Sequence, residues 1–493
     1  MATSTSVDRK TPRSGMKMAP STLDLLVLTF NCAKNLINPN VLASHLRSAL
    51  GQNATGLPDL IVLSLQEVAP LSQAFIGDYF LSPYFARFDE AVNLAAVQYG
   101  ETRGPDVISV TPTEATGGSR QYTLLKAKNV GYTAILLFAK DPACVRHLQE
   151  AEVGFGAADM GNKGAVGLRA TYQLGDGEQS TELTFVATHL AAMEWNLPRR
   201  NANWAAIMRG MTFGNPEEVL DKARGVERTP TPEGPGAEER HRLLHDEHHQ
   251  QHLELQRQLH DISVFKPSSH LFVAGDLNYR ISTSAPPPNA AFPSLDPDSE
   301  HHYPTFFPLD QLTRERLAGR TLHGLTEHRV DFPPTYKYVV QPVATPAAEI
   351  NVPWKFAPHR YPSWTDRILY LDVPPWTRSR SDGPRINVRA YDALPVVRTS
   401  DHRAVFLRAD VPLVSPGDLA PPASLAGPDA EADPRFRLPV EIDPEAWERR
   451  RAARQKEQFL GWSMFLWSTK EGAWILATLL AASLGGYWLY QSA

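Results

Sequence analysis

The 493-residue sequence predicts a mixed α/β fold followed by a membrane-spanning helix. Between residues 21 and 412, short apolar runs typical of buried strands alternate with stretches of helical character. Several runs end at a polar residue, which is where sheet scaffolds commonly present functional side chains. A longer apolar stretch, residues 473–490, has the length and composition of a helix that crosses a lipid bilayer.

Five apolar runs lie beside an acid, an amide or a histidine. In chain order they are Leu25–Phe30 before Asn31, Leu60–Leu65 before Gln66 and Glu67, Leu183–Thr188 before His189, Leu271–Val273 before Asp276, and Ala404–Leu407 after Asp401 and His402. This set suits metal-assisted phosphate hydrolysis, because a hard divalent cation binds oxygen ligands and an anionic substrate needs hydrogen-bond donors.

The stretch Val273–Arg280 carries the strongest of these signals. Gly275 permits a tight turn, after which Asp276 and Asn278 project together at a period of two. An acceptor and a donor then face one spot. Local turn chemistry offers an alternative, an Asx-rich turn without a catalytic role. For each histidine the corresponding alternative is a core residue with satisfied hydrogen bonds.

Taken together, the motifs resemble the inositol polyphosphate 5-phosphatases of the endonuclease/exonuclease/phosphatase superfamily. The resemblance covers residues 21–412 and implies a four-layer sandwich, in which two packed mixed β-sheets are flanked by helices and the site lies at one end. The matching blocks are Thr29-Phe30-Asn31, Leu65-Gln66-Glu67-Val68, Gly161 to Val166, Thr188 to Ala192, Arg200-Asn201, Gly275 to Arg280, Pro334 to Tyr338, Pro362 to Leu369 and Ser400 to Arg403.

The resemblance also implies roles for the residues at the chemical centre. Asp276 would orient or deprotonate the attacking water, and Asn278 would fix that water and a phosphate oxygen. His189 and His402 would donate hydrogen bonds to the phosphate. Two further acids would support this cluster: Asp366 would hold His402 in its useful tautomer and favour its cationic form, and Asp401 would help to position the group.

Metal and substrate ligands follow from the same resemblance. Glu67, assisted by Asn31, would hold Mg²⁺, which stabilises negative charge during phosphate transfer. Tyr336 and Lys337 would contact the 4-phosphate of an inositol ring, with Arg360 as a weaker candidate. Lys163 and Asn162 would meet the 1-phosphate, the group that carries diacylglycerol in a lipid. The alternative for Tyr336 and Lys337 is an ordinary surface turn.

Two positions depart from the family pattern. Met193 stands where a histidine usually closes the block after His189, and Asn203 stands where an acid usually follows Arg200-Asn201. A catalytically dead protein that only binds the lipid is therefore a competing hypothesis.

Composition narrows the function classes. A net charge of −5 argues against a general nucleic-acid binder. A nuclease of the same superfamily is a further alternative, but it would need neither the block Pro334 to Tyr338 nor a membrane tail. Only two cysteines occur, as expected in a reducing compartment. Neither Cys32 nor Cys144 is followed by an arginine six places later, so the phosphate-binding loop of the cysteine-dependent phosphatases is absent.

Outside the catalytic blocks, the sequence predicts accessory segments. Residues 1–20 should form a disordered tail, and residues 215–239 and 284–304, which are rich in charge or proline, should be mobile surface insertions. Residues 413–442 are rich in proline, alanine and acid, and they predict a linker with little fixed structure.

Residues 443–472 should form a juxtamembrane helix that begins near Asp443-Pro444. Its basic residues, Arg449, Arg450, Arg451, Arg454 and Lys456, would attract anionic lipid on the cytoplasmic side, and its aromatic residues, Phe459, Trp462, Phe465 and Trp467, would bridge to the anchor. A solvated helix is the alternative. For residues 473–490 the alternative is a buried or amphipathic helix, but aromatic rings at both ends favour a bilayer.

The anchor also favours a substrate. An enzyme held at a bilayer meets phosphoinositides at high effective concentration, whereas soluble inositol phosphates gain nothing from the anchor. We therefore expect a monomeric, tail-anchored phosphatase, most simply in the endoplasmic reticulum with its catalytic domain in the cytoplasm. It would convert phosphatidylinositol 4,5-bisphosphate to phosphatidylinositol 4-phosphate. The trisphosphate lipid and soluble inositol polyphosphates remain alternative substrates.

Overall fold

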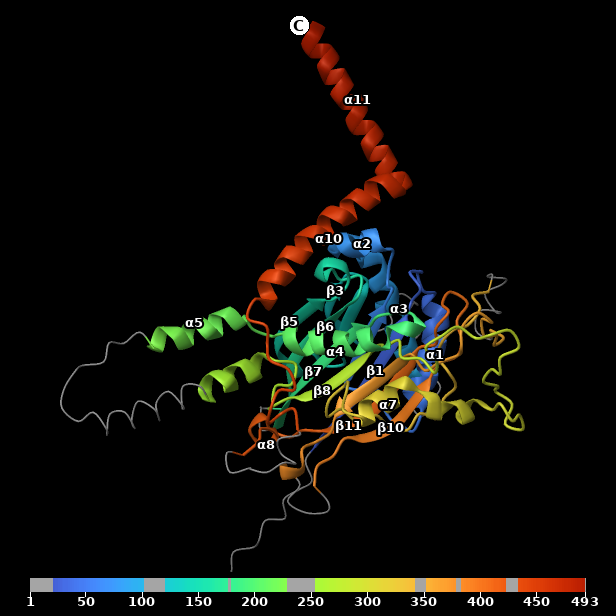
Figure 1. Cartoon of the computed structure of the whole chain (residues 1–493), viewed down its shortest axis with the longest axis vertical. Coiled ribbons are helices and arrows are strands. Elements are labelled where there is room, and N and C mark those ends of the chain that lie inside the picture. The colour runs from blue at the N-terminus through green and yellow to red at the C-terminus, as the bar shows by residue number, and fades with distance from the viewer. Residues whose placement is uncertain are drawn as a thin grey trace, which may run out of the picture.

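The computed structural model describes residues 21–101, 120–175, 179–227, 253–341, 352–377, 383–422 and 433–492. The predicted N-terminal tail, residues 1–20, lies outside the described residues. Within them, strands form two sheets, one of six strands and one of five. Figure 1 shows these strands at the centre, with helices around them and a long C-terminal helix that projects away.

The six-stranded sheet is mixed, because β1 and β2 pair in parallel and the remaining neighbours pair in antiparallel. The parallel pair matters for the site, since the carboxyl ends of both strands meet at one edge. In spatial order the strands are β10 (Asn387–Ala393), β11 (Val405–Pro412), β1 (Thr22–Asn31), β2 (Leu60–Gln66), β4 (Thr133–Ala139) and β3 (Thr123–Val130).

The five-stranded sheet repeats this arrangement, with β7 and β8 as its parallel pair. Its strands in spatial order are β5 (Val145–Gly154), β6 (Gly164–Leu174), β7 (Gln179–His189), β8 (His270–Asp276) and β9 (Asp366–Leu371). Towards their carboxyl ends β7 and β8 are fully buried, as expected for strands covered on both faces.

The two sheets pack face to face through a shared apolar core, in which Val27 and Val62 of one sheet join Phe185 and Phe272 of the other. A second cluster lies between the six-stranded sheet and the helices α1 (Pro39–Gly51) and α3 (Ser82–Glu101). A third lies between the five-stranded sheet and α4 (Leu197–Gly210) and α7 (Gln311–Leu317). The predicted four-layer α/β sandwich is therefore confirmed.

Short elements connect these layers. They are α2 (Leu71–Ile76), η1 (Asp78–Phe80), η2 (Pro142–Cys144), η3 (Ala157–Asp159), η4 (Glu194–Asn196), η5 (Tyr303–Leu309), η7 (Pro375–Thr377) and α8 (Pro416–Leu419).

The insertion at residues 215–239 begins as a helix, which corrects the prediction of a loop throughout. α5 spans Pro216–Glu227, and residues 228–239 lie outside the described residues. The Asn215 side chain accepts a hydrogen bond from Glu217 N at 3.2 Å, and two acids occupy the first turn, both of which favour a helix start. A segment rich in charge and proline is therefore not always a loop, since its first part here forms a helix.

The second insertion, residues 284–304, contains no helix or strand before η5 begins at Tyr303. It nevertheless contacts the body, because the Phe292 and Tyr361 rings stack with centroids 5.6 Å apart. Its predicted mobility stays a prediction.

The predicted linker, residues 413–442, is more structured than expected at its second end. Residues 423–432 lie outside the described residues, but Leu438 and Val440 pack on the apolar cluster beneath α4 and α7. Arg435 is buried and pairs with Asp433 at 3.0 Å. The linker prediction was wrong here because a few apolar residues of this proline-rich segment pack on the catalytic domain. Composition alone does not show that such a contact exists.

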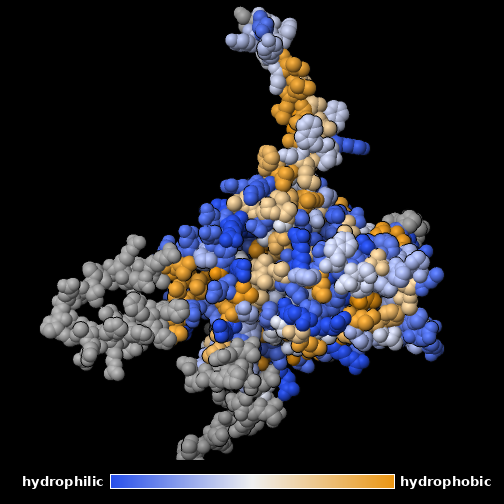
Figure 2. Space-filling model, in the orientation of Figure 1, coloured by the Kyte–Doolittle hydropathy of each residue, from blue (hydrophilic) through white to orange (hydrophobic). Residues whose placement is uncertain are grey.

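Two helices follow this segment. α10 spans Ala446–Ser468, so the predicted juxtamembrane helix begins at Ala446 and not at Pro444. α11 spans Lys470–Ser492 and contains the predicted span 473–490. Among the described residues it is the helix long and apolar enough to cross a membrane. Figure 1 shows α10 lying along the body and α11 leaving it, and Figure 2 shows hydrophobic side chains along the projecting part.

Candidate active site

Three predicted residues lie in one row across the ends of neighbouring strands in the five-stranded sheet. His189, the last residue of β7, pairs with Asp276, the last residue of β8. Asp276 in turn pairs with Asp366, the first residue of β9. The register of the sheet therefore places an imidazole and two carboxylates side by side, although they are far apart in the sequence.

The six-stranded sheet brings a second group to the same place. Asn31 at the end of β1 pairs with Gln66 at the end of β2, and Glu67 follows directly. The Asn31 side-chain amide donates to Asp276 Oδ2 at 3.1 Å, which joins the two sheets at the site. Deeper between the sheets, the Ser64 hydroxyl donates to Ala274 O at 2.8 Å. Both sheets therefore supply one cluster.

His402 completes the catalytic cluster, a name used here for His189, Asp276, Asp366 and His402. Its Nδ1 lies 2.9 Å from Asp366 Oδ2, and its Nε2 lies 3.9 Å from Asp276 Oδ2. Burial opposes the charged imidazole, but Asp366 and Asp276 outweigh it and raise the pKa of His402 to about 9. His402 is therefore cationic at neutral pH, as predicted from its acidic partner.

Hydroxyl groups fix the orientation of Asp366. The side chains of Thr335 and Thr365 donate to Asp366 Oδ2 at 2.7 and 2.8 Å, while its Oδ1 is buried without a partner among the described residues. Asp366 Oδ2 thus binds His402, Thr335 and Thr365 at once. The other carboxylate oxygen is left open.

Asp276 is an ionised acceptor. Burial alone would raise its pKa, but His402, His189 and Lys163 together hold the pKa of the Asp276 carboxyl well below its usual value. His189 behaves in the opposite way. Burial and Lys163 lower its pKa, so His189 is a neutral imidazole that contacts Lys163 Nζ and lies 3.3 Å from Asp276.

Glu67 lies at the edge of this cluster in a left-handed backbone conformation, with φ of 47°. Burial would raise its pKa, but His189, Lys163 and Lys34 lower it, so Glu67 is ionised. Lys34 contacts Glu67 Oε2 at 3.0 Å. Sequence reasoning missed Lys34, because it lies in a turn after β1 rather than at a strand end.

The turn after β8 holds Asn278, which was assigned a role from the sequence, and Arg280, which was not. Asn278, with φ of 57°, is fixed by its amide donating to Leu190 O at 3.1 Å. Arg280 donates to Asn278 Oδ1 and stacks over the Tyr336 ring at 4.2 Å. The Nε and Nη1 atoms of Arg280 are buried without partners among the described residues. The position of Arg280 in the same motif was the available signal.

The predicted 4-phosphate ligands lie beside His402. The Tyr336 and His402 rings have centroids 4.4 Å apart. Lys337 Nζ binds Asp401 Oδ2 at 2.6 Å, and Asp401 Oδ1 lies 4.0 Å from His402 Nε2. Burial would raise the pKa of Asp401, but His402 and Lys337 lower it. Asp401 thus links the lysine to the cluster.

The remaining predicted ligands are arranged less centrally. Lys163 contacts His189, and burial lowers the pKa of Lys163 to about 8 despite Asp276 and Glu67. The Oδ1 atom of Asn162 is buried without a partner among the described residues. Arg360 instead pairs with Glu194 at 3.1 Å and approaches Met193 Sδ at 3.8 Å. No contact in the described residues joins Arg360 to the catalytic cluster.

Asn203 and Met193, the two departures from the family pattern, have different surroundings. Asn203 is buried, and its side-chain oxygen accepts from Ala191 N at 3.0 Å, a bond that an amide makes as well as an acid. Met193 is 41% exposed and adopts φ of 73°. Arg200 donates to Met193 O at 2.7 Å and so fixes the loop that follows His189.

The donor set fits a hard divalent cation. Asp276, Asp366 and His402 offer ligand atoms within 4.8 Å of one another, but His402 already binds Asp366 as a charged donor and would repel a cation. The Glu67 carboxylate and the Asn31 amide oxygen are the better candidates, because Mg²⁺ prefers oxygen ligands. Asn31 contacts ionised Asp276 through its amide nitrogen, and Glu67 pairs with Lys34.

Comparisons with known proteins agree with this arrangement. Residues 28–408 match the family described as Endonuclease/Exonuclease/phosphatase family 2. The chain is 27% identical over 354 residues to the polyphosphatidylinositol phosphatase INP53 of Saccharomyces cerevisiae, in an alignment that covers 71% of this chain and 23% of that protein. It is 25% identical over 283 residues to the human phosphatidylinositol 3,4,5-trisphosphate 5-phosphatase 2, covering 57% and 18%. The chain thus spans about a fifth of the length of these relatives.

One solved structure is similar over most of both chains. The inositol polyphosphate 5-phosphatase domain of SPsynaptojanin, in complex with inositol (1,4)-bisphosphate and calcium ion, is 19% identical and has a TM-score of 0.49, with 89% of this chain and 90% of that chain covered. Since the family match alone extends over most of the sequence, the chain belongs to the endonuclease/exonuclease/phosphatase family 2, and the relatives named above agree with its predicted resemblance to the inositol polyphosphate 5-phosphatases.

Proposed function

We propose that this protein hydrolyses the 5-phosphate of phosphatidylinositol 4,5-bisphosphate with Mg²⁺, and that water attacks the phosphorus directly. The observation that carries the proposal is the row His189, Asp276 and Asp366 with cationic His402 beside it. An ionised carboxylate next to a charged donor can hold a water and a phosphate oxygen at the same time.

The residues divide the work. Asp276 accepts a hydrogen bond from the attacking water and orients it, while Asn278 is held close by through Leu190 and Arg280. His402 donates to the phosphate and neutralises charge as the new oxygen–phosphorus bond forms and the bond to the inositol oxygen breaks. That oxygen takes up a proton, and phosphate leaves. Glu67 and Asn31 would hold Mg²⁺, which would supply further charge stabilisation when bound.

Substrate choice rests on cations outside this centre. Lys337 and Tyr336 lie next to His402, where a 4-phosphate would share Lys337 with Asp401. Lys163 and Asn162, in the loop before β6, are proposed to meet the 1-phosphate, with Lys163 Nζ beside His189 as the cation. Arg280 adds two unpaired donors, counted among the described residues. Arg360, turned to Glu194, has the weakest claim.

The C-terminal helices support a lipid substrate. α11 has 23 residues, which at about 1.5 Å per residue is about 35 Å of helix, enough to cross a bilayer. Exposed aromatic side chains lie on η1, at Tyr79, and on the second half of α10, at Trp462 and Trp467. Such rings settle at membrane interfaces. We propose a tail anchor in the endoplasmic reticulum, with the catalytic domain in the cytoplasm.

Phosphate release from reconstituted vesicles tests the proposal. Full-length protein should release phosphate from phosphatidylinositol 4,5-bisphosphate with Mg²⁺ and not after chelation, and Asp276→Ala should lower kcat by about a thousandfold. Equal activity of the two proteins would refute the mechanism.

Three further arms identify the substrate. The trisphosphate lipid and free inositol 1,4,5-trisphosphate distinguish the lipid and soluble alternatives, and the absence of release from all of them, with retained lipid binding, would indicate a binding protein. Equal kcat/KM on free head group and on vesicles would contradict the lipid preference.

A further inference from the structure

α10 is fastened to the catalytic domain by a close helix contact. A Cβ atom at Gly461 would lie 2.9 Å from Phe75 Cβ and 3.0 Å from Ser72 O, so α10 approaches α2 at a point where only glycine fits. Arg454 of α10 donates to Phe75 O at 3.1 Å, one of the unpaired carbonyls at the end of α2. Phe465 packs on Phe80 with ring centroids 5.0 Å apart.

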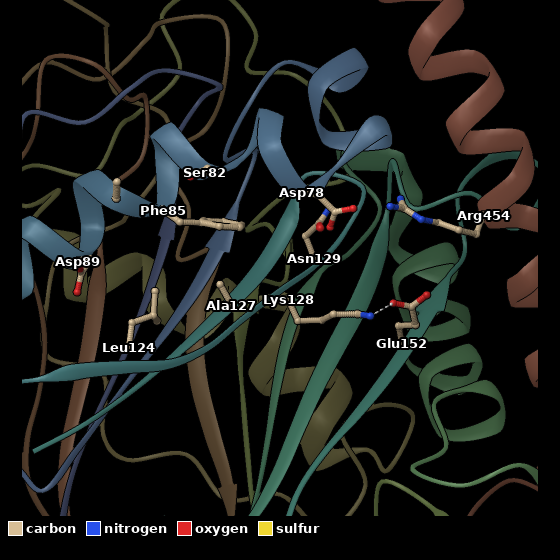
Figure 3. A pocket seen from close by; sticks show the side chains of 11 residues that line it. Asp78, Ser82, Phe85, Asp89, Leu124, Ala127, Lys128, Asn129, Glu152 and Arg454 are labelled. Atoms are coloured by element: carbon tan, nitrogen blue, oxygen red, sulfur yellow. Dashed lines mark ion pairs between the residues drawn. The ribbon is translucent and has the colours of Figure 1, made fainter. Parts of the chain in front are cut away.

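A hollow lies beside this contact. A cavity of about 640 Å³ opens between α3, β3 and Arg454, and Figure 3 shows that charged, polar and apolar side chains line it. Its lysine is not free for a ligand, because Lys128 pairs with Glu152 and Glu150. The cavity therefore gives no separate binding site. The position of α10 is fixed by a few specific contacts.

The innermost of these contacts is Glu457. Its side chain is fully buried, and it accepts hydrogen bonds from Arg450, which also binds Glu152 at 2.8 Å. Glu457 Oε1 accepts a further bond from Gly161 N at 2.7 Å. Gly161 precedes Asn162 and Lys163, so a carboxylate of the anchor-bearing helix holds the backbone of a site loop.

That loop needs outside support. Residues Ala158 and Asp159 both have positive φ, 52° and 61°, which is unfavourable for side chains with a Cβ. On its other side Gly161 is wedged against the β3–β4 turn, where its Cβ would lie 2.5 Å from Val130 Cγ1. The loop is therefore clamped between that turn and Glu457, with Lys163 reaching His189 from its end.

We propose that Glu457 is a positioning residue for the reaction: by holding Gly161 N–H it sets the loop that presents Lys163 to the catalytic cluster. The anchor-bearing helix is thus part of the active-site framework and not only a tether. Glu457 lies beyond residue 408, where the family match ends, so this support belongs to the C-terminal extension. The inference rests on the proposed phosphatase function.

A pair of variants isolates the bond. In an Arg450→Leu background, Glu457→Leu removes the acceptor for Gly161 N–H, whereas Glu457→Gln keeps a side-chain oxygen for it. Replacing both members of a buried ion pair by apolar residues usually preserves stability, so the doubly apolar variant should stay folded. Glu448→Ala, which removes an exposed carboxylate from the same helix, serves as the control.

Activity is measured on free inositol 1,4,5-trisphosphate with the full chain in detergent, so that membrane contact plays no part. We expect kcat/KM to be about tenfold lower for Arg450→Leu/Glu457→Leu than for Arg450→Leu/Glu457→Gln, because small displacements of positioned groups are costly. Amide hydrogen exchange should accelerate in residues 155–163 of the former and not in β7. The control should match the wild type in both measurements.

Equal kcat/KM and equal loop exchange in the two double variants would overturn the inference. So would a loss of activity without faster exchange in the loop. If the wild type itself releases no phosphate, the proposed function fails, but the exchange comparison still decides whether Glu457 holds the loop.

Discussion

Two buried charge networks of this protein differ in how completely their hydrogen bonds are closed. The α10 network consists of Arg450, Glu457 and Glu152, and every guanidinium nitrogen of Arg450 has a partner. In the catalytic cluster, by contrast, His189 Nδ1 and Asp366 Oδ1 are buried without partners among the described residues. Nearby, the Nε and Nη1 atoms of Arg280 are also buried without partners among the described residues.

The difference separates a network that is open to a ligand from one that holds protein groups in place. Burying an unpaired polar group costs about 1–3 kcal/mol, so native proteins rarely leave several in one place without a reason. Open donors and acceptors at converging strand ends are ready for a substrate that brings its own oxygens. The closed α10 network has nothing left to offer a ligand, and its contribution is to hold α10 and the loop at Gly161 in place.

The largest effect on activity should come from substituting His402 in the catalytic cluster. His402→Gln removes the cation that faces the phosphate and should lower kcat by about a hundredfold or more. Because the folded-state pKa of His402 is raised from 6.5 to about 9, its charge and the stability it gives are complete below about 6.5 and are lost as pH rises through about 9.

The wild-type pH profile therefore checks the same residue. We expect wild-type kcat to fall above about pH 9 with Mg²⁺ held constant. His402→Gln should lack that limb between about pH 7 and about pH 10. A limb of the same midpoint in the variant would assign it to another group.

A smaller effect, on stability rather than turnover chemistry, should come from the closed network. Arg450→Leu leaves Glu457 buried with fewer partners and should lower the free energy of unfolding by about 3 kcal/mol. Urea denaturation of the full chain in detergent measures this change. Arg449→Leu is the matched control, because Arg449 is exposed and its pairs with Asp443 and Glu445 should contribute less than about 1 kcal/mol. An equal decrease in the free energy of unfolding of the two variants would contradict a special role for the buried network.

The smallest effect should come from the basic residues of α10 that belong to neither network. Arg451 and Lys456 are exposed. Arg451→Ala/Lys456→Ala should leave unfolding unchanged and lower activity on anionic vesicles by up to about fivefold for each charge, since each is worth about 1 kcal/mol near such a surface. High salt should abolish the difference. An effect on free head group would contradict a role at the membrane.

These residues also show where sequence reasoning about α10 stopped. Five basic residues in one helix predicted a uniform membrane-facing cluster. Two of them, Arg450 and Arg454, are instead bound to Glu457, Glu152 and backbone carbonyls of the catalytic domain. A helix periodicity cannot tell which face meets protein, because the partner surface is formed by distant segments.

The candidate catalytic residues were easier to find, because strand ends, turn glycines and ordered motifs are local signals. Asp276, Asn278 and His189 follow apolar runs, and their chemistry is legible from type and spacing. Arg280 lies within the same motif but had no assigned role, since nothing local shows that its Nε and Nη1 lack partners among the described residues.

Local patterns in the chain were enough to establish the α/β class, the family, the charged residues at the strand ends and the apolar C-terminal helix. Three contacts became visible only in the folded protein: Asn31 reaches Asp276 across two sheets, Arg360 turns to Glu194, and Glu457 holds Gly161. Each of them joins residues far apart in the chain, and sheet register and helix docking bring those residues together.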